Sequence, residues 1–217
     1  MRIGVLASGS GTILDAILEN RVEVSLVVTD RPCRAIEVAA SAGVPCLEIP
    51  RTSFGKDFDR EGYSERVVTV LDDYGIDLVA MAGYGTILSA VMHQRFSGRV
   101  LNTHPSLLPS FPGWHAVESA LEFGVKVTGC TVHLATLEVD SGPILAQEAI
   151  RILPGDDKER LHERIKETER LLYPATISAF AKHLEAGNKG LFDLGMSVVR
   201  NDDGVLTLEK YEDCKEF

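Results

Sequence analysis

Apolar runs alternate with stretches of helical periodicity through the first hundred residues. Runs that are apolar on both faces, separated by helices, are typical of a parallel sheet covered on both sides. The predicted strands are IGVLA (3–7), VSLVV (24–28), CLEI (46–49), DLVAMAG (77–83) and RVLN (99–102). The predicted helices begin near Thr12 and cover about 36–42, 58–74 and 88–96. We therefore predict a doubly wound α/β core.

The second half of the chain has a different pattern. TGCTVHLA (128–135) and GPILAQEAI (142–150) are separated by a short acidic stretch, 138–141, which favours antiparallel neighbours over a parallel crossover. A long amphipathic helix follows from Asp157 to Leu184, and Tyr173-Pro174 predicts a bend or break in it.

The last thirty residues predict a hairpin. SVVR and VLTLE are joined by Asn201-Asp202-Asp203-Gly204, a turn-forming sequence. We expect residues 1–186 to form the main domain, and 187–217 to be a carboxyl-terminal hairpin extension of that same domain.

Composition and charge narrow the class of protein. With 217 residues, 45% hydrophobic and 25% charged, the chain suits one globular core. The net charge of -10 argues against nucleic acid or an anionic membrane as a partner, although a small anionic substrate stays compatible with it. The chain shows neither a signal peptide at its amino terminus nor an apolar run of roughly 20 residues. We expect a cytoplasmic protein that acts on small molecules as a monomer or homodimer.

The four cysteines are too scattered for a zinc site or a redox pair. They are interpreted as small, mostly buried residues in a reducing compartment. No metal ligands are expected from these positions, which are Cys33, Cys46, Cys130 and Cys214.

Three polar or glycine-rich segments follow predicted strands of the sheet. They are SGSGT (8–12), GYGT (83–86) and NTHPSLLP (102–109). Ligands of open α/β sheets bind at the carboxyl ends of the strands, and these ends share one edge. The three segments are therefore expected to face one cleft.

The first segment is a candidate phosphate site. Gly9 and Gly11 stand between a strand and a helix, where unpaired N–H groups and the helix dipole favour an anion. The sequence is neither a Walker loop nor a complete G-x-G-x-x-G, because Leu14 occupies the last glycine position. A tight turn without any ligand explains the glycines equally well.

The third segment places a carboxamide and an imidazole two residues apart. If the strand continues, Asn102 and His104 share one side of the backbone. A histidine exchanges a proton near neutral pH, and an asparagine amide donates to an oxygen that gains negative charge. A histidine that only bonds a loop carbonyl is the competing interpretation. Asp140, in TLEVDSGPI, either supports the charged imidazole or is an ordinary turn residue.

The combined motifs resemble the phosphoribosylglycinamide formyltransferase family, which uses 10-formyltetrahydrofolate in purine biosynthesis. The resemblance covers about residues 1–185. It rests on SGSGT, DREGY (59–63), MAGYGTIL (81–88), NTHPSLLP, TVHLATLEVDSGPI (131–144) and KETERLLYP (166–174). It implies a Rossmann-like fold, transfer of a formyl group from the folate to a primary amine, and no metal.

The resemblance also implies roles for individual residues. His104 would be the general acid–base, Asn102 would steady the oxyanion, and Asp140 would support the imidazole. The ribose phosphate of glycinamide ribonucleotide would lie against Gly11, Thr12, Ile13, Leu14 and Asp15, and Glu169 would meet its amine end or ribose. The folate would contact Arg60, Asn102 and the main chain of Gly85, Thr86, Ile87 and Leu88.

Two positions depart from the family pattern. Ile13 stands where the phosphate loop usually carries asparagine, and Gly85-Thr86 stands where a bulky pair such as Met-Arg is common. These departures leave other activities open. A formyltetrahydrofolate deformylase, a sugar-nucleotide formyltransferase and a non-catalytic folate-binding protein are the alternatives.

Overall fold

The computed structural model describes residues 1–53, 55, 57–188, 192, 196–201 and 203–210. Asp202, in the predicted turn, and Cys214 lie outside these residues. The chain forms two compact units. The first comprises Met1–Asn102 and Leu134–Gly142, and the second comprises Thr103–His133 and Pro143–Phe217.

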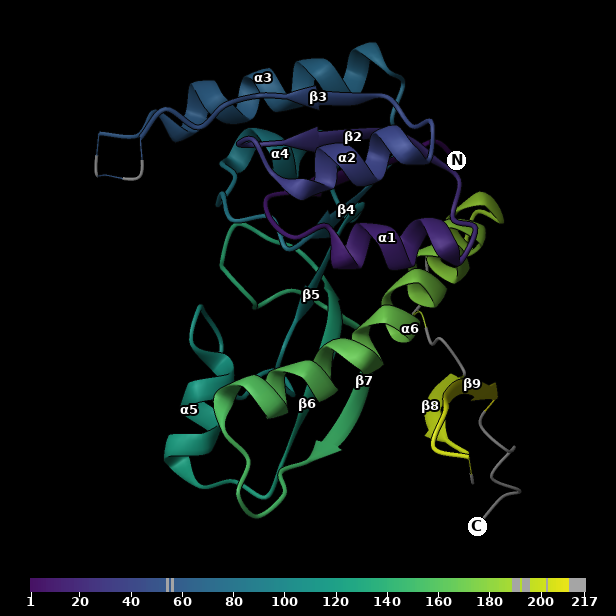
Figure 1. The fold of residues 1–217 in the computed structure, drawn as a ribbon. Helices are drawn as coiled ribbons and strands as arrows, with labels where there is room; N and C mark the ends of the chain where they lie inside the picture. Colours follow the sequence, from purple (N-terminus) through teal and green to yellow (C-terminus); the bar gives the residue numbers. More distant parts are fainter. Residues whose placement is uncertain (54, 56, 189–191, 193–195, 202, 211–217) are drawn as a thin grey trace. The chain divides into compact units, whose positions relative to one another are not determined.

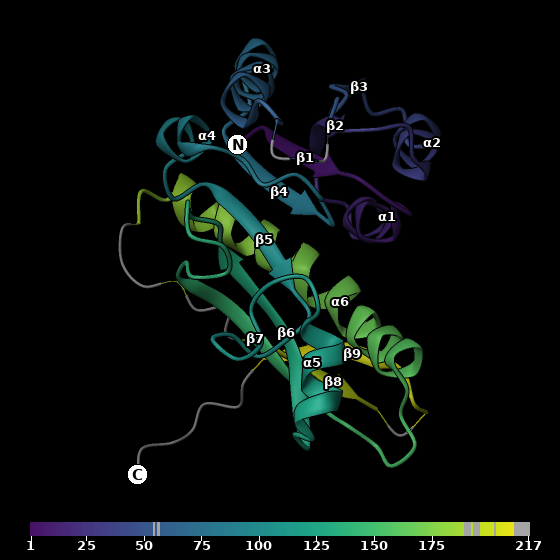
Figure 2. The same ribbon diagram turned by 90° about the vertical axis from the view of Figure 1, so that its left-hand side faces the viewer.

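The first unit is a parallel sheet with helices on both faces. Its strands are β1 (Ile3–Ala7), β2 (Val24–Thr29), β3 (Cys46–Glu48) and β4 (Leu78–Ala82), and β5 (Val100–His104) begins in it. Its helices are α1 (Thr12–Glu19), α2 (Arg34–Ser41), α3 (Arg60–Asp73) and α4 (Ala90–Arg95). The pairs β1/β2, β1/β4, β2/β3 and β4/β5 are all parallel. Figure 2 shows α1 and α2 on one side of these strands and α3 and α4 on the other.

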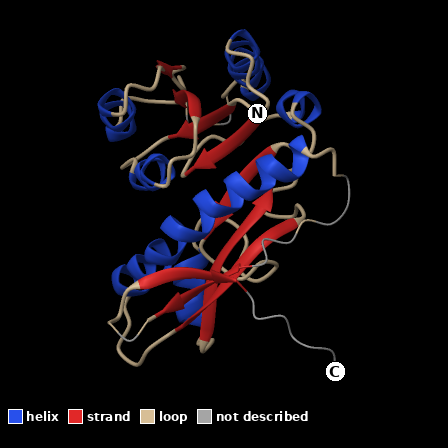
Figure 3. Ribbon diagram, turned by 90° about the vertical axis from the view of Figure 1, so that its right-hand side faces the viewer, coloured by secondary structure: helices blue, strands red, loops and turns tan. Residues whose placement is uncertain are grey.

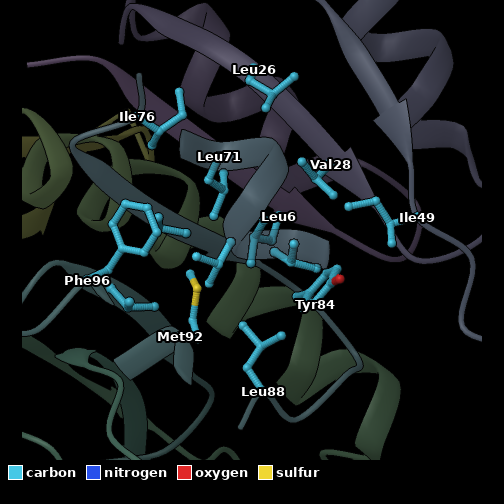
Figure 4. Packing of buried hydrophobic residues seen from close by; sticks show 14 of the residues in the cluster. Leu6, Leu26, Val28, Ile49, Leu71, Ile76, Tyr84, Leu88, Met92 and Phe96 are labelled. Carbon is cyan, nitrogen blue, oxygen red and sulfur yellow. The ribbon is translucent and has the colours of Figure 1, made fainter. Parts of the chain in front are cut away.

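The core of the first unit explains this layering. All five residues of β1 are buried, so the strand needs cover on both faces. On one face, Leu6 and Leu26 pack with residues from α3 and α4, among them Leu71 and Met92 (Figure 4). The Asp59 side chain accepts a hydrogen bond from the Gly62 N–H and so caps the amino end of α3.

The second unit is built on an antiparallel pair and a long helix. Its elements after β5 are α5 (Ala116–Phe123), β6 (Val127–Leu134), β7 (Ile144–Arg151), α6 (Lys158–Glu185), β8 (Met196–Arg200) and β9 (Leu206–Lys210). β6 and β7 pair antiparallel, as do β8 and β9 (Figure 1). Helix α6 contacts β7, α5 and the β8/β9 hairpin. The Val198 N–H donates to the Glu148 carboxylate at 2.9 Å, which ties the hairpin to β7.

The strands are hydrogen-bonded in the order β3-β2-β1-β4-β5-β6-β7, with β8-β9 separate. The predicted doubly wound, mostly parallel sheet with antiparallel strands late in the chain is therefore confirmed, and so is the terminal hairpin. β5 extends two residues beyond the predicted RVLN and reaches His104.

Two predictions about helices differ from the structure. Helix α6 continues through Pro174 as one 28-residue helix, so the expected break is absent (Figure 3). Leu172, Tyr173 and Ile177 are fully buried around the proline, and their packing outweighs the lost backbone hydrogen bond. Helix α5 was not predicted, because its eight residues span little more than two turns and give a weak periodic signal.

Gly129 in β6 is required by close backbone contact. A Cβ at this position would overlap the carbonyl oxygen of Glu148 on β7 and lie 2.7 Å from the Leu107 side chain. Gly129→Ala is expected to lower the free energy of unfolding by about 1–3 kcal/mol in urea denaturation. Gly9→Ala, where an added Cβ meets nothing within 4 Å, is the control. Equal stability of both variants would show that the β6/β7 pair adjusts freely.

Candidate active site

The loop after β1 presents main-chain groups to any ligand. Gly11 is the N-cap of α1 with φ 72°, and a Cβ there would lie 3.1 Å from the Ala35 backbone, so the position favours glycine. Ile13 and Leu14 are buried in the core. The Asp15 N–H already donates to the Gly11 carbonyl at 2.8 Å. The preceding N–H groups of the first turn have no partner within the helix and are the donors suited to an anion.

This geometry shows what the replacement of asparagine by Ile13 changes at a phosphate site. Its side chain is only 8% exposed, so it contributes to packing. The main-chain N–H is independent of the side chain. A phosphate site at this loop therefore depends on the backbone conformation that Gly11 permits, and loses only the side-chain contact an asparagine would supply.

The loop after β4 carries four of the predicted folate residues. Thr86 is 1% exposed and Leu88 is 3% exposed, so both side chains point into the protein. Ile87, at 37%, is the exposed side chain of the group. The Gly85 N–H donates to the Ser8 hydroxyl at 2.7 Å, which joins this loop to the loop after β1. Arg60, in the first turn of α3, is exposed.

Asn102 and His104 lie on the same strand, β5, as the sequence predicts. Asn102 is half-buried, pairs in register with Met81 and belongs to the first unit. His104 is 5% exposed and belongs to the second. Its Nε2 lies 2.8 Å from the Phe111 carbonyl oxygen, which only accepts hydrogen bonds. Nε2 therefore carries the hydrogen of this bond.

Asp140 belongs to the first unit and has an unusual backbone conformation. Its φ is 55°, in the left-handed region that side-chain-bearing residues seldom adopt, and its side chain is half-buried. A Cβ at Gly142 would overlap the carbonyl oxygen of Leu134, so the two ends of this loop approach closely. Backbone geometry therefore restricts which residues can occupy positions 140 and 142, independently of any chemistry of the carboxylate.

Glu169 is buried in the second unit. It lies on α6, is 8% exposed, and accepts a hydrogen bond from the Thr103 hydroxyl at 2.7 Å. Burial raises the pKa of this carboxyl, and the hydrogen bond from Thr103 offsets only part of the effect. The sequence interpretation missed Thr103. Its position between Asn102 and His104 could have indicated it, because the middle residue of three in a strand points to the opposite face of the sheet.

Within each unit, the structure brings some predicted residues together. In the first, Gly85 contacts the loop after β1 through Ser8, and Thr86 contacts Asp30, which follows β2. Ser8 lies in the predicted segment 8–12, whereas Asp30 was not predicted as a site residue; it follows β2 directly because this strand extends one residue beyond the predicted 24–28. In the second, Glu169 contacts Thr103.

The described residues contain no group of three or more His, Cys, Asp or Glu side chains arranged to hold a metal ion. Cys33 and Cys46 are half-buried, and Cys130 is buried; all three are free thiols. Over the described ranges, no helix combines the length and apolar character that crossing a bilayer requires.

The fold is of the doubly wound α/β class, with polar loops at the carboxyl ends of parallel strands. A profile of the formyl transferase family matches residues 1–177, and the chain belongs to this family. It is therefore a formyltransferase enzyme.

Named relatives agree with this family. The chain is 46% identical over 187 residues to a phosphoribosylglycinamide formyltransferase of Mycobacterium tuberculosis, covering 84% of this chain and 86% of that one. It is 38% identical over 187 residues to the human trifunctional purine biosynthetic protein adenosine-3, covering 83% of this chain and 18% of that one. A crystal structure of glycinamide ribonucleotide transformylase 1 from Symbiobacterium toebii matches with TM-score 0.78 and 39% identity, covering 96% of this chain and 93% of that one.

Glu169 is expected to reduce stability at neutral pH. Its folded-state pKa lies above the ordinary 4.5, so the unfolded chain loses this proton first as pH rises, and stability falls. Glu169→Gln keeps an acceptor for Thr103 but carries no ionisable group. We expect it to resist urea better than the parent at pH 7.5, with the difference vanishing near pH 4.

Glu122→Gln, on an exposed position of α5, is the matched control and should leave the urea midpoint unchanged at both pH values. If Glu169→Gln were no more stable than the parent at pH 7.5, burial of the Glu169 carboxyl would not lower the stability of the protein.

Proposed function

We propose that this protein transfers the formyl group of 10-formyltetrahydrofolate to the primary amine of 5-phosphoribosylglycinamide. The products are formylglycinamide ribonucleotide and tetrahydrofolate, in de novo purine biosynthesis. The observation that carries this proposal is the 46% identity to a named phosphoribosylglycinamide formyltransferase over most of both chains. The retained Asn102, His104 and Asp140 support it.

The reaction needs two proton movements and one stabilised oxyanion. The substrate amine attacks the formyl carbon, and a tetrahedral intermediate forms. The bond from that carbon to the folate nitrogen then breaks, while the amine loses a proton and the folate nitrogen gains one. In this proposal His104 moves the proton, Asn102 donates to the oxyanion, and Asp140 favours the charged imidazole.

The substrate contacts follow the same proposal. The ribose phosphate of 5-phosphoribosylglycinamide binds the backbone of 11–15, and Glu169 meets its amine end or ribose. The main chain of 85–88 holds the folate, together with Arg60 and Asn102. The buried Ile13 and Thr86 side chains support recognition by backbone groups at both loops.

The cellular setting is also a proposal. A cytoplasmic enzyme, acting on small molecules without nucleic acid or membrane, as a monomer or homodimer, agrees with the acidic composition. Residues 1–186 would carry the activity, and 187–217 would extend the same domain.

Formation of tetrahydrofolate with and without 5-phosphoribosylglycinamide tests the activity. We expect turnover only with this acceptor, because its amine is the nucleophile. Equal rates without acceptor would identify a deformylase. Turnover only with an amino-sugar nucleotide would identify a sugar-nucleotide formyltransferase, and no turnover with any acceptor would indicate a folate-binding protein.

His104→Ala is expected to lower kcat by about 10²–10⁴-fold, the usual contribution of a general acid–base group. The far-ultraviolet circular dichroism spectrum should match that of the parent. His115→Ala removes an exposed histidine at the start of α5 and should keep parental activity. Near-normal turnover by His104→Ala would exclude the role assigned to this residue.

A further inference from the structure

The loop after β4, residues 83–88, is held by hydrogen bonds and core packing from other residues of the first unit. The Tyr84 hydroxyl hydrogen-bonds the Tyr63 hydroxyl, and both tyrosines are buried. The Gly85 N–H donates to Ser8, and the Thr86 hydroxyl donates to Asp30 at 2.7 Å. The Leu88 side chain packs in the core. Every residue from 84 to 88 except Ile87 is thus anchored within the first unit.

Asp30 is the charged centre of these contacts. It is 1% exposed and receives two hydrogen bonds from the Arg31 guanidinium, at 2.9 and 3.0 Å, besides the one from Thr86. Burial raises the pKa of its carboxyl, but hydrogen bonds from Arg31, Thr86 and Ser8 outweigh that effect, so the pKa lies below the ordinary value. A buried carboxylate with this many donors is held in one geometry.

The same contacts determine which groups of the loop are already hydrogen-bonded within the protein and which can contact a ligand. The Thr86 side chain is used by Asp30, and the Gly85 N–H is used by Ser8. The loop can therefore present two things to a ligand: its main-chain groups other than the Gly85 N–H, and the exposed Ile87 side chain. Recognition through backbone gains affinity when the backbone is already fixed before binding.

We propose that Asp30 is a positioning residue for the formyl donor, and that Thr86 transmits its effect to the backbone of 85–88. This inference rests on the proposed function, because it assigns the folate to this loop. Asp30 touches neither substrate in this role. Thr86 fills, with a short hydroxyl bonded to a buried carboxylate, the position where the family often carries a larger side chain.

Ser8 gives the arrangement a second consequence. It is the first residue of the loop 8–12, to which the proposed function assigns the ribose phosphate, and it accepts a hydrogen bond from the Gly85 N–H, so it links the two loops. Removing its hydroxyl should weaken binding of both substrates. Removing the Thr86 hydroxyl should weaken binding of the donor alone, because this hydroxyl bonds to Asp30 and not to residues 8–12.

The test compares Thr86→Val with Thr29→Val. Both replace a buried threonine by a side chain of the same shape, but the Thr29 hydroxyl has no hydrogen-bond partner among the described residues. For Thr86→Val we expect the KM for 10-formyltetrahydrofolate to rise about tenfold, as for loss of a hydrogen bond to a charged group. The KM for 5-phosphoribosylglycinamide should be unchanged. Thr29→Val should change neither.

Asp30→Asn, which keeps the shape but lowers the charge, should raise the donor KM at least as much. Thermal unfolding of each variant identifies any that fails to fold. If Asp30→Asn does not fold, the KM values of Thr86→Val alone decide whether the inference holds. Equal shifts in both KM values, or no shift in Thr86→Val, would overturn the inference and leave a purely structural network.

Calorimetric titration with tetrahydrofolate separates this inference from the proposed function. If the parent binds tetrahydrofolate but formylates no acceptor, the proposed function fails. Weaker tetrahydrofolate binding by Thr86→Val than by Thr29→Val would still support the positioning role. Equal binding by the two variants would overturn it.

Discussion

The parallel pairing of β1 with β2 and β4 is the constraint on which the first unit depends. In its register Ala7 lies opposite Thr29 on one side and Ala82 on the other. The three strands therefore end level, and the residues that follow them, Ser8, Asp30 and the loop after β4, emerge side by side. Hydrogen bonds between loops that are distant in sequence become short-range contacts for this reason. The buried, apolar strand sequence thus indirectly determines which polar groups meet.

Asp30 and Glu169 show how the surroundings of a buried carboxyl decide its ionisation. Both are nearly inaccessible to water. Asp30 receives hydrogen bonds from a guanidinium and two hydroxyls, and its pKa is lowered. Glu169 receives one from Thr103, and burial raises its pKa. At Asp30 the guanidinium and hydroxyl donors outweigh the effect of burial on the pKa, whereas at Glu169 they do not.

Much of the fold could be predicted from the sequence because strands and helices of this class have strong periodic signals. The pairing of Asn102 with His104 followed from the two-residue repeat of a strand. The contacts of Asp30 and Thr103 could not be predicted, since they depend on which strands are neighbours and which helix covers the sheet. The predicted break at Pro174 was wrong because the helix-breaking preference of proline is local, whereas the packing of the buried residues around it keeps α6 continuous. The roles assigned to the site residues stay predictions.

The left-handed backbone at Asp140 limits which residues can occupy that position. Asparagine and aspartate tolerate this conformation better than other side-chain-bearing residues. Sequence drift at this position is therefore channelled toward a neutral side chain of the same shape. The negative charge at this position is therefore separable from the loop conformation, because asparagine keeps the backbone while removing the charge.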